Sequence, residues 1–384
     1  MSIQEPASIV TGEAPGASTG TLERIKLYAA RNERRLAVSF FVAGFLFDIL
    51  TLGRIDAGLT IGQQAIYLLA VTAVLVHMLL GEERTAAPVA PDRAAASRLK
   101  RGYFEYRNPA IHFLLGALLS AYALFFFKSS SLLVSFGFLG VLVALLIANE
   151  SARFKALGLR FKFALLGLCY LSFFAYVIPV LVGQTGLAVF LLSMAAGCVP
   201  LAAAAFWLAP EKKRKILVPL GCVLIVFLGF YLFRLIPPVP LSIRFMGVYH
   251  GVERTDAGYR LSHERPAWRF WHKGDQWFSA QPGDKVHVYF RIFSPARFSD
   301  QVLMGWYRHE GGAKGRGWVL QDTIPIKILG GRDAGFRGYG VKSNYQPGKW
   351  KVQVETTDGR EIGRIYFSLE AVPQGARDIV AELD

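Results

Sequence analysis

The chain has 384 residues, of which 53% are hydrophobic and only 18% are charged, and its mean hydropathy is +0.35. These values exclude an ordinary soluble globular protein, in which about a quarter of the residues are charged. The formal net charge of +15 would favour a nucleic-acid partner only if the basic residues gathered on one domain, and they do not.

The apolar residues form blocks of the length that crosses a bilayer, which is about 17 to 25 residues for a helix. Seven such blocks are expected to be transmembrane helices. They are residues 36–53, 64–80, 110–127, 132–148, 163–182, 187–208 and 216–235. The third and fourth are separated by only four residues, which predicts a tight helical hairpin between them.

The basic residues of the connecting segments predict the orientation. Nineteen lysines and arginines lie in the N-terminal arm and in the second, fourth and sixth connections, whereas the alternate connections contain only Arg54 and Lys128. Cytoplasmic loops retain Lys and Arg, so the N-terminus is expected in the cytoplasm. Seven crossings then place the C-terminal part outside it, and the localisation expected for the chain is a bacterial inner membrane in contact with its lipids.

These patterns divide the chain into four parts. Residues 1–20 are expected to be a disordered cytoplasmic tail, residues 21–235 a seven-helix transmembrane domain, residues 236–242 a proline-rich linker and residues 243–384 an extracytoplasmic domain. From Leu241 onward there are 21 basic and 16 acidic residues, so nucleic acid is not expected to bind this part of the chain. All three cysteines fall in the apolar blocks, which leaves no disulfide framework or cysteine-based metal site outside the membrane.

Ionisable residues within a bilayer are costly and therefore mark candidate functional sites. Asp48, near the outer end of the first block, is the first candidate, either as a proton or cation site or in a structural role, as a helix-terminal ion pair with Arg54 or as a cap for a neighbouring helix. His77 lies toward the inner end of the second block, on the order of 13 Å from Asp48 in depth. A direct relay between the two is therefore not expected, and His112 is closer to His77 in depth.

Beyond residue 242 the apolar period changes to two, which is typical of strands. Residues 284–293, 350–354 and 365–369 alternate most clearly, residues 357–360 read as a hairpin turn, and shorter strands fit residues 246–252, 268–271, 302–308 and 324–329. Seven to nine short strands with Gly and Pro turns predict an antiparallel β-sandwich. The fold class expected is thus α+β, a seven-helix bundle followed by that sandwich.

Six of the seven tryptophans lie in this exterior domain, where they either fill the core or stack on a sugar or a partner. On a regular strand, residues three apart face opposite sides, so Trp268 and Trp271 cannot both point inward. Trp271 is predicted to be the exposed member of the pair, and Trp306 is predicted to form part of a wall that faces the next loop.

Residues 330–340 form the most distinctive loop, with glycines that let backbone N–H groups converge on an anion. Arg332 and Arg337 could clamp a phosphate or carboxylate there, with Tyr339 beside them; the alternative is a structural loop in which Asp333 holds one arginine. No nucleophile, base and orienting partner come together in the sequence, so we expect no catalytic residues, no metal and no cofactor.

Several of these motifs resemble an uncharacterised family of bacterial multi-pass membrane proteins that end in a domain of unknown function. The motifs are residues 47–48, 51–56, 236–242, 247–250, 330–340, 347–350 and 358–360. The resemblance implies a bacterial envelope protein and carries no activity or catalytic residue with it.

The sequence therefore predicts a non-catalytic membrane protein whose exterior domain binds an envelope glycan, an anionic ligand or a partner protein. A transporter or ion-coupled protein that uses Asp48 is the alternative, and an intramembrane enzyme is the third reading.

Overall fold

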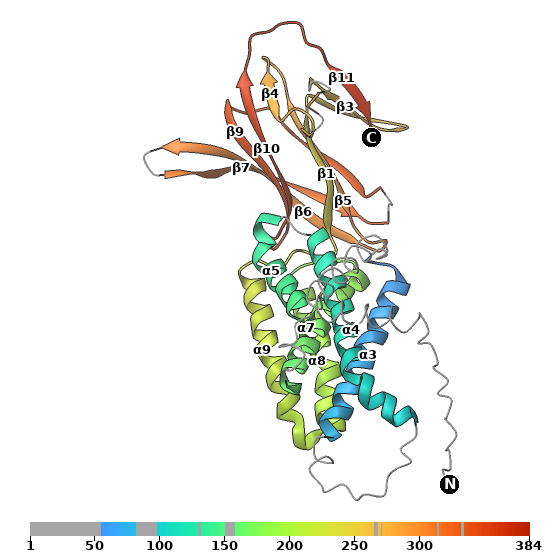
Figure 1. Ribbon diagram of the computed structural model, residues 1–384. Coiled ribbons are helices and arrows are strands. Elements are labelled where there is room, and N and C mark those ends of the chain that lie inside the picture. Colours follow the sequence, from blue (N-terminus) through green and yellow to red (C-terminus); the bar gives the residue numbers. More distant parts are fainter. Residues whose placement is uncertain are drawn as a thin grey trace, which may run out of the picture. The chain divides into compact units, whose positions relative to one another are not determined.

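The computed structural model describes residues 55–81, 98–129, 132–149, 158–264, 268–269, 271–312, 315–331 and 334–384. All of them belong to one compact unit, Leu52–Asp384. Helices come first and strands second, so the architecture is mixed α+β (Figure 1). The expected helix 36–53 lies outside the described residues, together with Asp48 and Arg54.

The described residues contain six of the seven expected helices. They are α3 (Gly58–Gly81), α4 (Arg98–Lys128), α5 (Leu132–Asn149), α7 (Leu159–Val182), α8 (Leu187–Ala203) and α9 (Lys213–Leu232), with the short turns η1 (Ala204–Leu208) and η2 (Pro210–Lys212) between α8 and α9. Five segments in this part of the chain are long and apolar enough to cross a membrane. α4 starts well before its apolar block, because the block marks only the span and the helix continues through a preceding segment that contains several good helix formers, Leu, Lys, Arg and Glu.

α7 is the central helix of this group and packs against α3, α4, α8 and α9. Two polar contacts join it to α3. Tyr176 Oη donates to Gln64 Oε1 at 2.8 Å, and the hydroxyls of Thr72 and Tyr170 lie 2.9 Å apart. Such bonds between otherwise apolar helices hold one helix against another where water is absent.

The strands form three sheets. The first has the order β1-β5-β8 and consists of β1 (Ser242–Tyr249), β5 (Val286–Phe293) and β8 (Phe336–Lys342). The second has the order β4-β10-β9-β6-β7 and consists of β4 (Trp277–Ala280), β6 (Ser299–Gly312), β7 (Gly315–Leu329), β9 (Gly348–Thr356) and β10 (Glu361–Ala371). The third has the order β11-β3-β2 and consists of β2 (Gly251–Thr255), β3 (Gly258–His263) and β11 (Val380–Leu383).

One hydrophobic core is shared by the three-stranded sheet of β1, β5 and β8 and by the five-stranded sheet. Phe290 of β5 and Trp306 of β6 are both fully buried in it. Two details differ from the expected antiparallel sandwich: β4 pairs with β10 in parallel, and the third sheet is additional. The expected strand at residues 268–271 is wrong, because the described residues there form turns.

The segment between α9 and β1 is packed rather than free. Ile236, Val239 and Leu241 are at most 5% exposed, and the Val239–Pro240 peptide bond is cis. Hydrogen bonds also join the helical part of the chain to the β-strands. Thr185, after α7, donates its N–H and its hydroxyl to Asp300 Oδ2 at 2.8 and 2.7 Å. The expected proline-rich linker is therefore part of the folded structure.

The β9–β10 turn makes a second contact with the helices. Tyr231 Oη of α9 donates to Asp358 Oδ2 at 2.7 Å, and Arg360 Nε lies 2.9 Å from the same oxygen. Gly359 adopts φ +78°, as the expected hairpin turn requires, and a β-carbon there would lie 2.8 Å from Arg234 Nη1. Residues 358–360 of the family-like motif thus serve as a contact with α9.

Candidate functional site

A short loop before β4 is held tightly between two sheets. Asp275 N–H donates to Val248 O of β1 at 2.7 Å, and Val248 N–H donates to Lys273 O at 3.1 Å. The close approach needs Gly274, whose φ is +68° and whose β-carbon would lie 1.9 Å from Val248 O. On the other side, Gln276 Nε2 donates to the backbone of β10 at 3.0 Å. The loop is therefore fixed although it has no regular secondary structure.

This loop and the first residue of β4 present three tryptophan side chains that are mostly exposed. Trp268, Trp271 and Trp277 are 61%, 57% and 61% exposed. The Arg269 guanidinium lies between two of them, 4.6 Å from the ring centre of Trp268 and 4.1 Å from that of Trp277. The Trp268 and Trp271 rings meet edge to face at 5.7 Å, and His272 meets Trp277 in the same way at 5.3 Å. Cation–π and edge contacts of this kind contribute about 0.5–1 kcal/mol each at exposed sites and hold the rings in place.

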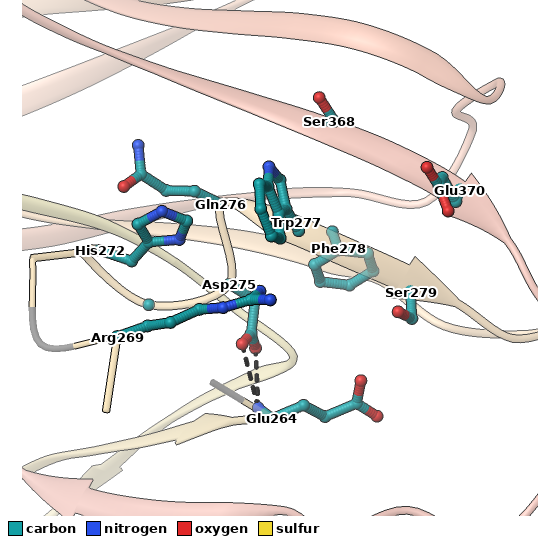
Figure 2. A pocket seen from close by; sticks show the side chains of 11 residues that line it. Glu264, Arg269, His272, Asp275, Gln276, Trp277, Phe278, Ser279, Ser368 and Glu370 are labelled. Atoms are coloured by element: carbon teal, nitrogen blue, oxygen red, sulfur yellow. Dashed lines mark hydrogen bonds between the residues drawn. The ribbon is translucent and has the colours of Figure 1, made fainter. Parts of the chain in front are cut away.

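Trp277 lines a pocket of about 540 Å³, and Trp268 is joined to this pocket through Arg269. Its lining combines Arg269, His272, Gln276 and Trp277 with Ser368 and Glu370 of β10, and Figure 2 shows the two β10 side chains across from Arg269. A site of this composition offers a flat apolar surface together with donors and acceptors of both charges. It suits a ligand that has apolar faces and many hydroxyl or amide groups. We call these residues, with Trp268 and Trp271, the tryptophan pocket.

A partly buried network of charged and polar groups adjoins the pocket and includes two of its lining residues, Glu264 and Asp275. Arg377 Nε is 3.0 Å from Glu264 Oε1, and its Nη2 donates to Asp284 Oδ2 at 2.6 Å. Both Asp275 oxygens accept the Glu264 N–H, at 3.1 and 3.0 Å, as the dashed lines in Figure 2 show. His250 Nε2 lies 3.4 Å from Glu264 and 3.6 Å from Asp275. The network ties the pocket floor to the segment before β11.

Burial lowers the pKa of His250 to about 4, and the positive charge of Arg377 adds to this effect. The carboxylate of Asp284 opposes this lowering of the pKa but does not reverse it. Although burial alone would raise the pKa of Asp284, hydrogen bonds from Arg377 and from the Gln281 N–H lower it. His250 is therefore neutral at physiological pH and contributes structure rather than charge.

The structure places the residues predicted for a binding site in different locations. Trp271 is exposed and its ring meets that of Trp268, but it does not line the pocket itself. Trp306 is 1% exposed and fills the core, so the expectation that it forms part of a binding wall is wrong. Tyr339 is partly exposed on β8 and meets Tyr259 at 6.2 Å, whereas Arg332 lies outside the described residues.

Arg337 is held by a carboxylate of the same chain. Its Nε lies 3.3 Å from Asp384 Oδ2, and Arg291 Nη1 lies 3.0 Å from Asp384 Oδ1. Tyr289 Oη also donates to Asp384. From residue 336 onward the expected loop is strand β8. Arg337, which was predicted to bind an external anion, thus forms an ion pair with Asp384 of the same chain.

Among the helices, His77 is exposed on α3 and His112 is buried on α4. The pocket between α7, α8 and the proline-rich segment has a volume of only about 10 Å³, enough for one water at most. In the described part of the chain, no group of three or more His, Cys, Asp or Glu residues is placed to hold a metal ion.

The pocket residues Arg269, His272 and Trp277 were missed because residues 268–271 were interpreted as a strand. A usable signal was present: residues 268–277 contain three tryptophans among charged and polar residues, without apolar alternation. Such a composition predicts a loop with exposed rings. Ser368 and Glu370 join the site through the β4–β10 pairing, which no local pattern reveals.

Comparison with known proteins identifies one domain. A family model described as "Protein of unknown function (DUF2914)" matches residues 299–369, from the first residue of β6 almost to the end of β10. The C-terminal, β-rich part of the chain therefore contains a DUF2914 domain. The match excludes β4 and the loop before it, so the tryptophan pocket is built partly from DUF2914 residues and partly from the segment that precedes them.

Solved structures give only weak similarities. The Pseudomonas fluorescens alkylpurine DNA glycosylase AlkC bound to DNA containing an abasic site analog is 12% identical, with a TM-score of 0.21 over 71% of this chain and 73% of that chain. The β-glucosidase from Listeria innocua in complex with glucose is 9% identical, with a TM-score of 0.18 over 35% of this chain and 18% of that chain. Neither supports an argument about function. No curated protein sequence matches the chain.

Proposed function

We propose that this is a bacterial inner-membrane protein with seven transmembrane helices and a cytoplasmic N-terminus. Its C-terminal β-sandwich lies outside the cytoplasm and binds a glycan of the cell envelope, without catalysis, through the tryptophan pocket. The charge asymmetry of the connecting segments supports the orientation, and the core shared by two sheets supports the sandwich.

One observation carries the proposal: three exposed tryptophans are held in fixed positions beside a pocket. Exposed aromatic side chains on a loop lose little entropy on binding when their neighbours already hold them in place. Arg269 and His272 provide that support through contacts with Trp268 and Trp277. The surface is thus preorganised for stacking.

The lining favours a glycan over the two other ligands considered. An anionic ligand would meet Glu264 and Glu370 as well as Arg269. A protein partner is expected to use a contiguous apolar patch, whereas Gln276, Ser279 and Ser368 alternate here with the rings. Sugars have apolar C–H faces and a rim of hydroxyls, which matches this alternation.

The test is co-sedimentation of the full-length protein, in detergent micelles, with purified peptidoglycan sacculi. Trp277→Ala should reduce binding at least about tenfold, the effect of roughly 1.4 kcal/mol, and Trp277→Phe should retain most of it because a ring remains. Equal binding by the wild-type protein and by Trp277→Ala combined with Trp271→Ala would refute the proposal.

A transporter or ion-coupled protein remains the second candidate because of three buried polar groups in the helices. Gln64 Nε2, Tyr122 Oη and Ser172 Oγ have no hydrogen-bond partner among the described residues. Polar groups buried within a bilayer without partners are costly and mark ion or water paths. If this reading holds, Asp48→Asn abolishes a measurable ion or proton flux in proteoliposomes while the protein remains abundant and folded.

A further inference from the structure

The five-stranded sheet has one face in the core and one face outside it. On the outer face, the strand register aligns residues from all five strands. Trp318 of β7 pairs with His309 of β6. In the next strand pair Arg308 lies opposite Trp350, so the antiparallel register places the following residue, His309, beside Lys349 of β9. Lys349 pairs with Ser368 of β10, and Ser368 pairs with Trp277 of β4. A single cross-strand row therefore leads from Trp318 to the tryptophan pocket.

This row spans the whole sheet. Neighbouring strands are about 4.8 Å apart, so the four intervals between β7 and β4 measure roughly 19 Å. A second row runs beside it, because Leu320 pairs with Tyr307, Tyr307 with Lys351, and Lys351 with Tyr366. The two rows form a continuous surface of aromatic and polar side chains, which we call the outer sheet face.

A second group of aromatic rings lies on this face and includes residues of β7 and β10. Trp318 is 36% exposed and Tyr366 is 40% exposed, and their ring centres are 5.5 Å apart. His309 meets Trp318 edge to face at 5.2 Å. Lys351 Nζ lies 4.1 Å from the ring centre of Tyr307 and 5.7 Å from that of Trp318. As at the tryptophan pocket, a cation and neighbouring rings hold exposed aromatics in place.

Charges of both signs are distributed over the outer sheet face. Four basic and three acidic side chains lie on this side of the sheet among the described residues: Lys327, Lys349, Lys351, Arg364, Glu355, Glu361 and Glu370. Arg364 is paired with Glu361, and Gln353 donates to Glu355 at 2.9 Å. A polyanion such as nucleic acid would find carboxylates among the basic residues and an excess of only one positive charge, so the surface suits a chain without a strong charge.

We propose that the outer sheet face and the tryptophan pocket form one extended site for a linear oligosaccharide. The inference rests on the proposed glycan binding and adds a second aromatic subsite at Trp318 and Tyr366. One sugar stacks in the tryptophan pocket and another on the rings of β7 and β10. The intervening sugars lie over Lys349 and Ser368, whose polar groups bond to their hydroxyls. The ligand is therefore a chain of several sugars rather than a mono- or disaccharide.

The experiment measures the affinity of the full-length protein, in detergent micelles, for chitooligosaccharides from the dimer to the hexamer. In the wild-type protein the affinity should rise at least tenfold over this series, because only longer chains reach both aromatic groups. Trp318→Ala should abolish the rise and leave the affinity for the dimer unchanged. Trp277→Ala should weaken the binding of every length.

Val319→Ala is the matched control, since Val319 is exposed on the opposite face of the same strand and should leave both affinities unchanged. If Trp318→Ala does not fold, Tyr366→Ala tests the same subsite. Dimer binding that depends on Trp277 but does not increase with length would overturn the extended site and leave the proposed function standing. Absence of binding at every length, or capture of a protein partner by this face instead, would overturn both.

Discussion

Replacing Gly274 with alanine should disrupt the tryptophan pocket through the backbone alone. The new β-carbon would lie 1.9 Å from Val248 O and 2.9 Å from its carbonyl carbon. No side-chain rotation relieves a contact between backbone atoms, so the loop must move away from β1. In doing so it loses the Asp275–Val248 and Val248–Lys273 hydrogen bonds.

The expected cost can be summed from these parts. A left-handed backbone conformation at an alanine costs roughly 1–2 kcal/mol. Each of the two hydrogen bonds contributes about 0.5–1.5 kcal/mol. Gly274→Ala should therefore lower the free energy of unfolding by about 3 kcal/mol, and glycan binding should be lost with it.

Gly283→Ala is the matched control. Gly283 has φ +93°, in the same conformational region, but no atom lies within 4 Å of a β-carbon placed there. Only the backbone term applies, so the cost should be about 1–2 kcal/mol. Tryptophan fluorescence during denaturant unfolding reports on the domain directly, since six of the seven tryptophans lie in it. Equal destabilisation by the two variants would show that the contact with Val248 is not a constraint.

Three further predictions concern stability. The pKa of His250 is about 4 in the folded protein and 6.5 ordinarily, so neutral His250 contributes fully to the free energy of unfolding above pH 6.5, and about 3 kcal/mol of it is lost as the pH falls toward 4. His250→Gln should therefore reduce the pH dependence of the free energy of unfolding between pH 6.5 and 4, and an unchanged dependence would contradict the assignment. Asp358→Ala leaves Arg360 buried without its carboxylate partner and should lower the free energy of unfolding by about 3 kcal/mol. Thermal unfolding measures this effect, with Asp256→Ala at an exposed position as the control, and equal effects of the two variants would contradict the contact. Trp306→Ala should cost about 3–5 kcal/mol in denaturant unfolding, and a cost below 1 kcal/mol would be incompatible with its burial.

Much of the architecture follows from local patterns. Apolar blocks predicted six helices that the structure describes, and alternation predicted β5, β9 and β10 and the turn that joins the last two. Both signals depend on which face of one element is buried, and this is written in consecutive residues.

The candidate site was less predictable because it depends on pairing between distant segments. Arg337 meets Asp384, and β4 meets β10, across separations that no sequence window covers. Trp306 and Tyr307 are consecutive residues of β6 and face opposite sides of the sheet; Trp306 pairs with buried Val352, whereas the register shift opposite them skips Gln321 of β7. Because either face of β6 could be the inner one until its pairing partners are known, alternation alone cannot tell which of the two aromatics is exposed.

The burial of Ile236, Val239 and Leu241 has a mechanical consequence. Because this connection is packed and is not a flexible linker, a pulling force on a glycan bound at the sheet would be transmitted directly to the end of α9. Asp358 and Tyr231 lie on the same load path. Tension in the cell wall would thus reach the membrane through a small set of identifiable bonds, and their strength sets the force at which the domain detaches.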